Sequence, residues 1–440
     1  MSIDGFIKRS MYWGNDYIHG KKVRRFYNHL KIVLSDEKIG RQIQQKDLRN
    51  LLEHATKNAP FYHQFSGKSL SEFPVVNKNI LNDNREGVCI PIEKIPGQEG
   101  TTVHIQRTSG STGTPFAVPQ DTRKRNRRVA ELKYFNELVG FKSHEKLAQC
   151  RIWTKWHSKS KWQSFKENII PVNIATMDDD DIKNLIETVK KNRVFAIRAY
   201  ASWYDALVKY LEAGKGNIAD LKSVKVCISI SEALNEYTRE KMLELAGIPI
   251  VEAYADEEAG MLAQQLIGDN NYYLNHSGYI FEFLKLEEDT PAEPGELNRI
   301  VITDLFNYAF PLIRYDTGDT AIYQNGNETS KGWPYISKLY GRRLDLVYDT
   351  QGKAVHPMNF ARVLKNLPGI IQWQFIQKDE KQYVVRLNLE SESSVDDKIN
   401  EIREILGADA DISIEFVNDI PVLASGKRKP VICEWKNKSL

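Results

Sequence analysis

Eight consecutive small residues, Thr108 to Pro115, form the stretch of this chain whose residue types are best suited to chemistry. They read Thr-Ser-Gly-Ser-Thr-Gly-Thr-Pro. The two glycines permit backbone conformations that other residues avoid, so main-chain N–H groups can converge on an anion, and the hydroxyls supply further donors. Such a loop is suited to bind phosphate. A surface turn or a flexible linker is the alternative, because most clusters of this composition are one or the other.

Two short apolar runs flank this loop and favour phosphate binding over a linker. Residues 103–105 precede it and residues 116–118 follow it, both with strand-like composition, which predicts that the loop is the tip of a hairpin. The loop contains no lysine and does not end in Gly-Lys-Ser/Thr, so it is not a Walker A loop. A nucleotide-dependent phosphotransferase or NTPase is therefore a weak alternative.

Two acidic clusters follow predicted strands in a region where strands and helices alternate. Between residues 193 and 260 this alternation predicts parallel strands joined by crossovers. Ser231-Glu232 follows one strand, and Tyr254-Ala255-Asp256-Glu257-Glu258 follows the next. Because ligands of open α/β sheets bind beyond the carboxyl ends of the strands, both clusters are candidates for a binding site.

Two charged stretches have structural interpretations beside functional ones. Residues 122–138 open with five Lys and Arg and turn amphipathic through Val129, Leu132 and Phe135. A solvated helix face is the first interpretation, and contact with a phosphorylated substrate or acceptor is the second. Asp178 to Asp181 suggests a metal site, but it precedes an apolar helical pattern, so an N-cap with an acidic first turn is favoured.

Single aromatic residues and histidines are weaker signals. His276 is expected to be a structural hydrogen-bond partner. The tryptophans Trp153, Trp156, Trp162 and Trp203 are expected to be core residues, with an aromatic substrate pocket as the alternative.

The composition is that of an ordinary globular protein. The chain has 440 residues, 41% of them hydrophobic and 27% charged, with a net charge of +3 and a mean hydropathy of −0.47. This charge is too small to imply nucleic acid or a membrane surface on its own. The four cysteines form no Cys-x-x-Cys pair, and no run of about 18 apolar residues is present. These features predict a cytoplasmic protein with reduced thiols and no membrane insertion.

The chain is predicted to divide into a first domain, residues 1–341, and a second, residues 346–440, with a hinge near residues 341–346. In the first domain, residues 22–58 are expected to be helical, and Arg314 to Asp319 is expected to be a polar turn among strands. The second domain reads as an α+β module with strands near 371–376, 383–389 and 412–417 and helices near 357–366 and 395–406.

Five motifs, in order and spacing, resemble those of the acyl-adenylate-forming superfamily, and most of all its branch of phenylacetate–CoA ligases, CapK proteins and coenzyme F390 synthetase. They are Thr108–Pro115, Tyr254–Glu258, Tyr315–Asp319, Gly341-Arg342 and Gly426-Lys427. The resemblance extends from about Ala59 to Lys429. It implies an α/β fold: a large N-terminal adenylate-forming domain with mostly parallel sheets, and a small, mobile α+β C-terminal domain.

The resemblance also implies roles for individual residues. The loop residues Thr108, Ser109, Gly110, Ser111, Thr112, Gly113 and Thr114 would hold the β- and γ-phosphates of ATP. The remaining nucleotide contacts would come from Ser231, Glu232 and Tyr254 around the adenine, Asp319 at the ribose, and Arg342 near the ribose and phosphates. Glu258 would help to hold Mg²⁺, and Lys427 would be the catalytic lysine. Plainer alternatives are a turn-capping Asp319, a solvated helix-start Glu258, and Lys427 as one of several tail lysines, with Lys429 its rival.

Two residues depart from the family's pattern. Glu257 stands where the family usually has a Ser or Thr hydroxyl, so an acid that would repel phosphate replaces a donor. Leu344 stands where an acidic residue is common at the hinge.

The implied function is an ATP-dependent, AMP-forming ligase. ATP and a small carboxylic acid would give an acyl-adenylate and pyrophosphate, and the acyl group would then pass to an acceptor. The acceptor would be the thiol of CoA, or an amine or hydroxyl of a sugar in capsule or surface-polysaccharide biosynthesis. The departures at Glu257 and Leu344 leave open a degenerate relative that binds nucleotide or a partner without turnover. The sequence specifies neither the carboxylate nor the oligomeric state.

Overall fold

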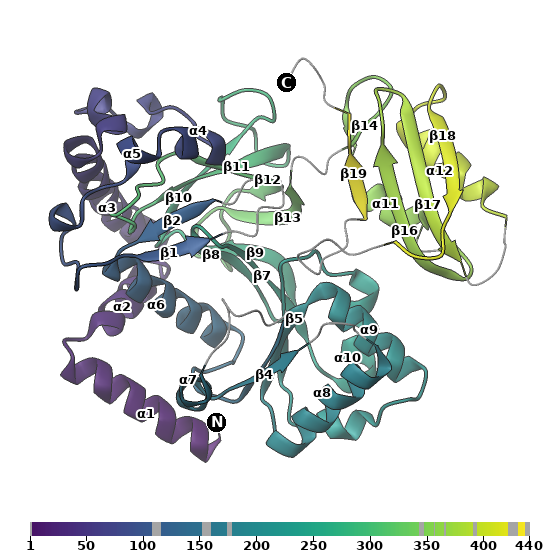
Figure 1. Cartoon of the computed structure of the whole chain (residues 1–440), viewed down its shortest axis with the longest axis horizontal. Helices are drawn as coiled ribbons and strands as arrows, with labels where there is room; N and C mark the ends of the chain where they lie inside the picture. The colour runs from purple at the N-terminus through teal and green to yellow at the C-terminus, as the bar shows by residue number, and fades with distance from the viewer. Residues whose placement is uncertain are drawn as a thin grey trace. The chain divides into compact units, whose positions relative to one another are not determined.

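The computed structural model of the chain describes residues 2–107, 116–151, 160–173, 178–342, 347–355, 357–364, 367–389, 394–420 and 430–435. The chain divides into two compact units (Figure 1). The large unit comprises Met1–Lys285, Asp289–Thr317 and Ala321–Leu339, and the small unit comprises Leu286–Glu288, Gly318–Thr320 and Tyr340–Leu440.

Several residues singled out from the sequence lie outside the described ranges. They are the whole loop Thr108–Pro115, Trp153, Trp156, the hinge residues 343–346 with Leu344, and the tail residues Lys427 and Lys429.

An 11-stranded sheet is the framework of the large unit, in the order β10-β11-β12-β13-β9-β8-β7-β6-β5-β3-β4. Its parallel part follows from the alternation of strands and helices in the sequence, and the predicted strands and helices between residues 193 and 260 are confirmed. The strands of this part are β3 (Leu147–Arg151), β4 (Ile169–Asn173), β5 (Ala196–Tyr200), β6 (Val226–Ile230) and β7 (Ile250–Asp256). The helices between them are α7 (Lys161–Glu167), α8 (Asp179–Asn192), α9 (Ala201–Glu212) and α10 (Glu236–Ala246).

Helices α8, α9 and α10 pack a shared apolar core against the parallel strands (Figure 1). Helix α8 presents Leu185 and Val189 to this core. The predicted cap of this helix is confirmed, because the Asp178 side chain accepts a 2.9 Å hydrogen bond from the backbone N–H of Asp181. Trp203 of α9 is fully buried in the same core, which confirms its predicted core role.

The rest of the sheet is antiparallel wherever its pairing is described, as in β7–β8, β8–β9, β9–β13 and β10–β11. Its strands are β8 (Gly260–Leu266), β9 (Asp269–Leu274), β10 (Tyr279–Leu284), β11 (Leu297–Asp304), β12 (Tyr315–Gln324) and β13 (Tyr335–Arg342). The predicted polar turn at Arg314 to Asp319 is wrong, because Tyr315 to Asp319 begin strand β12. Partners satisfy the polar groups there: Arg299 pairs with Asp316 at 3.0 Å, and Thr317 donates to the Ile300 carbonyl.

Helices at the start of the chain and a small hairpin complete the large unit. The helical prediction for residues 22–58 is confirmed, with a break between α2 and α3. The elements are α1 (Ile3–Ile18), α2 (Lys22–Val33), α3 (Glu37–Asn58), η1 (Pro60–Phe65), η2 (Leu70–Glu72), α4 (Lys78–Asp83), α5 (Arg85–Val88), η3 (Ile92–Lys94), β1 (His104–Arg107), β2 (Ala117–Gln120), α6 (Thr122–Leu138) and η4 (Ile218–Leu221). No helix in the described ranges is long and apolar enough to cross a membrane.

Helix α6 occupies its predicted range but turns a different face inward. Lys124 is buried and pairs with Asp304 at 2.6 Å, and Arg127 is buried and pairs with Glu131 at 3.0 Å. Val129 and Leu132, expected on the apolar face, are 39% and 38% exposed, whereas Phe135 is buried as expected. The solvated-face interpretation is therefore wrong for Lys124 and Arg127, because buried acids balance their charges.

The small unit is an α+β module. A four-stranded sheet in the order β18-β17-β16-β19 is packed with two helices around a separate apolar core. The predicted strands and helices of this region are confirmed. The elements are β14 (Val347–Tyr348), β15 (Ala354–Val355), α11 (Pro357–Leu364), β16 (Ile370–Gln377), β17 (Gln382–Leu389), α12 (Asp396–Leu406), β18 (Asp411–Phe416) and β19 (Val431–Cys433).

Candidate active site

The two polar clusters singled out from the sequence lie at the carboxyl ends of neighbouring parallel strands of the large unit. Strand β5 ends at Tyr200, β6 is followed by Ser231-Glu232, and β7 ends in the segment Tyr254 to Asp256. Strands β6 and β7 pair in parallel, with Ile230 opposite Ala253. The two clusters predicted from the sequence therefore lie side by side at one edge of the sheet, where ligands of such sheets bind.

Ser231 and Glu232 form a tight turn after β6. Ser231 has a φ of 68°, in the left-handed region that residues other than glycine rarely adopt. One oxygen of Glu232, Oε2, accepts a 2.9 Å hydrogen bond from the N–H of Ser202 in the first turn of α9. The other oxygen, Oε1, is buried and has no hydrogen-bond partner within the described part of the chain. Glu232 therefore caps a helix with one oxygen and leaves the second as an unsatisfied acceptor.

A buried glutamate on β7 holds the segment that follows this turn. Glu252 accepts a 2.9 Å hydrogen bond from the N–H of Leu234 and pairs with Arg239 at 2.7 Å. Burial raises the pKa of Glu252, while the Leu234 N–H and the Arg239 guanidinium oppose that rise. The turn at Ser231 is thus anchored from the neighbouring strand.

Glu258 lies in the connection from β7 to β8 and is 6% exposed. Its Oε1 accepts a 2.7 Å hydrogen bond from the Tyr315 hydroxyl, and its backbone carbonyl accepts one of 3.0 Å from Gln120 Nε2 on β2. The Tyr315 ring stacks on Phe116, the first described residue after the Gly/Ser/Thr loop. A solvated helix-start acid is therefore wrong for Glu258, which is a buried carboxylate beside the exit of the loop.

The strands that flank the loop form the predicted hairpin. Strands β1 and β2 pair antiparallel, with Arg107 opposite Ala117. Gln106 of β1 donates a hydrogen bond from Nε2 to Glu257 Oε2, and Arg128 of α6 donates one of 2.8 Å to the Glu257 carbonyl. Glu257 and Glu258 thus lie against opposite strands of the hairpin that carries the loop.

Asp319 and Arg342 lie on the adjacent strands β12 and β13. Asp319 is 7% exposed and follows Gly318, whose φ of +77° suits glycine. Next to Asp319, the Thr320 hydroxyl donates a 3.2 Å hydrogen bond to the Gly341 carbonyl, the residue before Arg342. Because Asp319 lies inside a strand, the turn-capping alternative is wrong.

The small unit and the whole chain have relatives among known proteins. The family model of the CapK C-terminal domain matches residues 347–434. The protein CapK of Staphylococcus aureus is 20% identical over 94% of this chain and 94% of its own length. This chain is similar to CapK over nearly its whole length.

Two ligases also resemble this chain. The phenylacetate–coenzyme A ligase of Escherichia coli strain K12 is 20% identical over 69% of this chain and 71% of its own length. A solved 2-hydroxyisobutyryl-CoA ligase, in the postadenylation state with its adenylate, matches with a TM-score of 0.72 at 15% identity over 92% of this chain and 91% of its own. The resemblance predicted from the sequence and the α/β fold class with a large and a small sheet domain are confirmed. The expectation of mostly parallel sheets is wrong for the large sheet, because its pairing is antiparallel beyond β7 wherever it is described.

Two residues at this edge, Tyr200 and Gln106, were not singled out from the sequence, and Tyr315 was named there only as part of a motif. Tyr200 ends β5 beside the other two strand ends, and burial is the main cause of its raised pKa, to which Glu232 and Glu257 also contribute. Gln106 and Tyr315 hold the two glutamates. A signal for Tyr200 is present in the sequence, because it lies within the strand–helix alternation predicted between residues 193 and 260.

Two residues singled out from the sequence lie elsewhere. His276 is 5% exposed, stacks on Trp333 and hydrogen-bonds to the Pro334 carbonyl through Nε2 at 2.9 Å. Its predicted structural role is confirmed. Trp162 of α7 is 63% exposed, so its expected core position is wrong.

The donor set fits a nucleotide-bound magnesium ion. Mg²⁺ commonly takes one or two protein carboxylates and completes its shell with phosphate oxygens and water. Glu258 offers such a carboxylate beside the loop's exit. Among the described residues no group of three or more His, Cys, Asp or Glu could hold a metal alone. This set would therefore hold Mg²⁺ together with phosphates.

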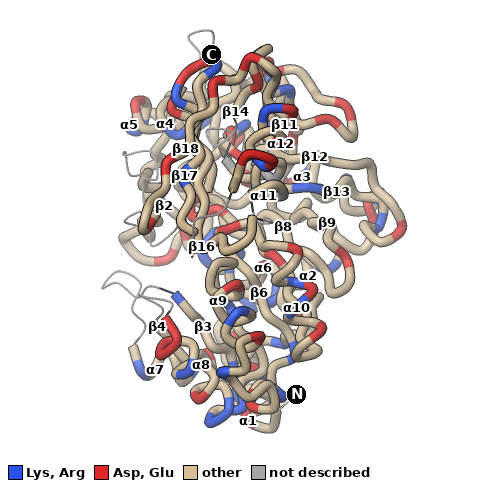
Figure 2. Tube along the Cα trace, turned by 90° about the vertical axis from the view of Figure 1, so that its right-hand side faces the viewer, with Lys and Arg blue, Asp and Glu red and all other residues tan. Residues whose placement is uncertain are grey.

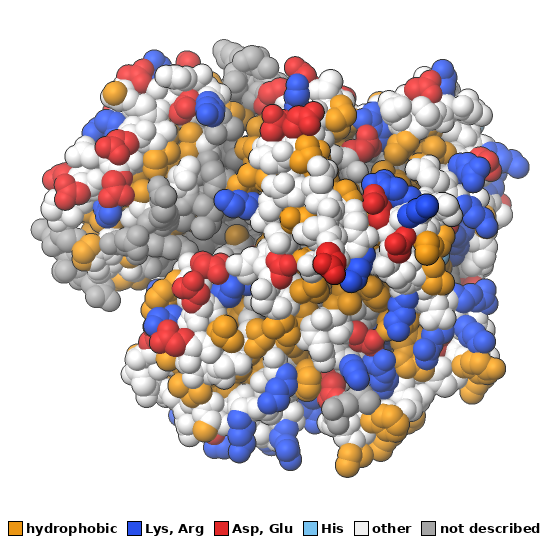
Figure 3. All heavy atoms as spheres, turned by 180° about the vertical axis from the view of Figure 1, so that it is seen from behind, with side chains coloured by type: hydrophobic (Ala, Val, Ile, Leu, Met, Phe, Trp, Pro, Cys, Tyr) orange, Lys and Arg blue, Asp and Glu red, His pale blue; other side chains and the backbone are white. Residues whose placement is uncertain are grey.

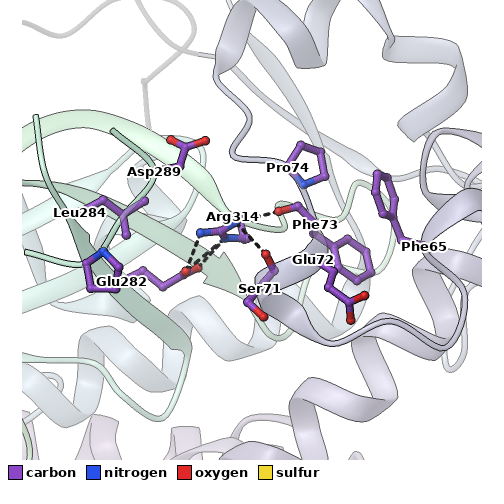
Figure 4. Close-up of a pocket in the computed structure, with 10 residues that line it drawn as sticks. Phe65, Ser71, Glu72, Phe73, Pro74, Glu282, Leu284, Asp289 and Arg314 are labelled. Atoms are coloured by element: carbon purple, nitrogen blue, oxygen red, sulfur yellow. Dashed lines mark hydrogen bonds and ion pairs between the residues drawn. The ribbon is translucent and has the colours of Figure 1, made fainter. Parts of the chain in front are cut away.

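A pocket of about 480 Å³ opens elsewhere on the large unit (Figure 4). Arg314 lies along its wall, with an ion pair to Glu282 at 2.9 Å and a 2.7 Å hydrogen bond to the Phe73 carbonyl. None of the predicted site residues lines this pocket. Because Arg314 is occupied by protein partners, its visible role is to fasten η2 to the sheet.

Proposed function

We propose that this chain is an ATP-dependent ligase that activates a small carboxylic acid as its acyl-adenylate. The observation that carries the proposal is the meeting of the ends of β5, β6 and β7 with two glutamates that contact the β1–β2 hairpin. This arrangement gathers polar groups at a strand edge next to a loop rich in backbone donors. Two of the similar proteins are named as CoA ligases, which supports the same assignment.

In the proposed first step, a carboxylate oxygen of the acid attacks the α-phosphorus of ATP. The bond from that phosphorus to the bridging oxygen of the β-phosphate breaks, and pyrophosphate leaves with the electron pair. The step needs positioning and charge neutralisation more than a base. Residues Thr108 to Thr114 would hold the β- and γ-phosphates, and Lys427 would stabilise the charge that develops on the leaving group. Mg²⁺ held by Glu258 would neutralise phosphate charge.

The nucleoside would be held by residues at the strand ends. Ser231, Glu232 and Tyr254 would surround the adenine, and Glu232 Oε1 supports this because it is a buried acceptor in need of a donor. Asp319 would accept hydrogen bonds from the ribose hydroxyls, and Arg342 would lie near the ribose and phosphates.

In the proposed second step, a nucleophile of the acceptor attacks the acyl carbonyl, AMP leaves, and the acceptor loses a proton. The thiol of CoA is one acceptor, supported by relatives whose names include CoA. An amine or hydroxyl of a sugar in surface-polysaccharide assembly is the other, supported by the longer match to CapK. We assign the nucleotide and carboxylate to residues 1–341, the lysine-bearing lid to residues 346–440, and the reaction to the cytoplasm, where ATP is made.

The test is AMP and pyrophosphate release from Mg-ATP by the purified chain over aryl, short-chain and amino acids. Each acid is assayed alone, with CoA, and with amino sugars. Release that depends on one acid supports the proposal, and the acceptor that accelerates it identifies the second step. Formation of ADP in place of AMP would contradict it. ATP binding without AMP formation from any acid would favour a non-catalytic relative, as the acidic Glu257 beside the loop suggests.

A further inference from the structure

Helix α1 exposes a row of apolar side chains to solvent, interrupted at Gly14. The exposed fractions are 82% for Ile3, 57% for Phe6, 51% for Ile7, 69% for Met11, 66% for Tyr17 and 79% for Ile18. Spacings of four and seven residues place Ile3, Ile7, Met11 and Ile18 on one side of the helix, with Gly14 between the last two. Phe6 and Tyr17 flank this row. An apolar stripe of this length on a surface helix marks a binding face.

The opposite side of α1 is already fixed to the large unit. Trp13 and Asp16 are buried, and Arg9 pairs with Glu137 of α6 at 2.5 Å. Asp16 also accepts 2.9 Å hydrogen bonds from the N–H groups of Val23 and Arg24 at the start of α2. The stripe is therefore presented by an anchored helix and is not the inward face of a loosely held one.

Two exposed aromatic residues of α7 extend this apolar face. Trp162 and Phe165 are 63% and 60% exposed, and their rings stack at a centroid distance of 5.9 Å. Lys8 of α1 lies 4.2 Å from the Phe165 ring centroid and donates a 3.0 Å hydrogen bond to Asn168. Helices α1 and α7 are thus neighbours, and we call their exposed residues Ile3, Phe6, Ile7, Met11, Tyr17, Ile18, Trp162 and Phe165 the α1–α7 face.

The N-terminal helices carry a net positive charge, although Lys8, Arg9 and Lys22 are held in ion pairs. Residues 2–33 contain seven Lys and Arg and two Asp, a net charge of +5, whereas the whole chain carries +3. Lys161 and Lys166 of α7 are exposed beside the two aromatic rings. Figure 2 marks the Lys and Arg of α1 and α2 in blue, and Figure 3 shows orange and blue side chains gathered at its lower right, where α1 lies.

We propose that the α1–α7 face docks on the surface of an anionic lipid bilayer, with α1 lying in the plane of the interface. Amphipathic helices bind there when an apolar face enters the headgroup boundary and flanking cations meet anionic lipid. Exposed tryptophan is typical of that depth. A second copy of this chain fits the face less well, because its own cations would repel those of the first copy. The proposal is independent of the proposed ligase activity.

The test is co-sedimentation of the full chain with phosphatidylcholine vesicles and with vesicles of 30% phosphatidylglycerol. We expect binding to the anionic vesicles that weakens with salt. Ile7→Glu/Met11→Glu should weaken it by about tenfold or more, and Lys21→Glu/Arg25→Glu by a similar factor. Vesicles should also shift tryptophan emission to the blue, and Trp162→Phe should remove most of that shift.

Matched controls separate docking from general effects of the substitutions. Leu243→Glu alters a similarly exposed apolar side chain of α10, and Lys46→Glu/Arg49→Glu makes the same charge change on α3. Both should bind as the unaltered chain does, and all variants should keep its circular dichroism spectrum. Equal binding to both vesicle types, or equal losses in control and face variants, would overturn the proposal. So would self-association that Ile7→Glu/Met11→Glu abolishes without any vesicle binding.

Discussion

Glu257 and Glu258 are adjacent in sequence but meet different surroundings, and this difference decides what each can do. Glu258 is buried and held by the Tyr315 hydroxyl, whereas Glu257 is exposed and held by Gln106. A carboxylate fixed by one neutral donor keeps lone pairs for a cation. The exposed Glu257 adds negative charge to the surface that the phosphates of ATP would approach in the proposed site.

Replacing Glu258 by Gln should lower kcat/KM for Mg-ATP by about 100-fold, because the amide keeps the shape but loses the charge that attracts the metal. Tyr315→Phe, which removes only the positioning hydroxyl, should cost about tenfold or less. Steady-state AMP formation over a range of Mg²⁺ concentrations measures both. Equal activity of Glu258→Gln and the unaltered chain would contradict the proposed role of Glu258 in holding Mg²⁺.

Replacing Glu257 by Thr restores the hydroxyl usual in the family and removes a negative charge near the loop. We expect the KM for ATP to fall by about three- to tenfold. The reason is that repulsion between the Glu257 carboxylate and a phosphate of ATP, partly screened by water, costs about 1 kcal/mol. Glu257→Gln is the matched control and separates the charge from the hydroxyl. A higher KM in both variants would mean that Glu257 itself helps to bind the nucleotide.

At the scale of elements, the connection from β9 to β10 contains a histidine that is buried in its neutral form. Burial lowers the pKa of His276 to about 4, and the Pro334 carbonyl opposes this shift. The unfolded chain takes up a proton near pH 6.5, but the folded chain does not until about pH 4. The free energy of unfolding should therefore fall as pH drops from about 6.5 to 4, by up to about 3 kcal/mol.

Urea unfolding of His276→Gln between pH 7 and pH 4 checks this expectation. The variant should be less stable at pH 7 but should lose less stability on acidification than the unaltered chain. His63→Gln, at an exposed histidine, serves as the control. A pH dependence equally steep in His276→Gln would place the acid sensitivity elsewhere.

The sequence predicted elements best where local pattern decides structure. The strand–helix alternation between residues 193 and 260 and the α+β module could be predicted because apolar spacing and caps are local signals. The burial of Lys124 and Arg127 could not be predicted in this way. Lys124 pairs with Asp304, which is far along the chain, and the sequence pattern does not show that Glu131, the partner of Arg127, points inward. The strand at Tyr315 to Asp319 could not be predicted for a similar reason, because its Asp316 pairs with Arg299 of another strand.

The candidate site shows the same division. The adjacency of Ser231 and Tyr254 could be predicted from the rule for parallel strands, and the β1–β2 hairpin from its flanking runs. The contact between Glu258 and Tyr315 joins residues 57 positions apart through sheet order, which no local pattern contains. The exposed apolar face of α1 could also have been predicted from the sequence, because Ile3, Ile7 and Met11 have helical spacing.

At the scale of the whole molecule, the large unit is proposed to bind ATP and the carboxylic acid, and the small unit is proposed to supply the catalytic Lys427. Lys427→Ala should lower AMP formation by about 10²–10³-fold, the usual effect of removing one preorganised stabilising group, while ATP affinity changes little. Lys429→Ala, two residues away, is the matched control and should retain activity. If Lys429→Ala is the inactive variant, the role passes to that lysine.

The most direct test of the central claim is the fate of oxygen when the activated acid is labelled with oxygen-18 in its carboxylate. Attack by that carboxylate on the α-phosphorus, followed by acyl transfer, leaves one labelled oxygen in AMP. Mass spectrometry of the AMP should therefore detect a single oxygen-18 with the unaltered chain. Unlabelled AMP, or label found in inorganic phosphate beside ADP, would contradict formation of an acyl-adenylate.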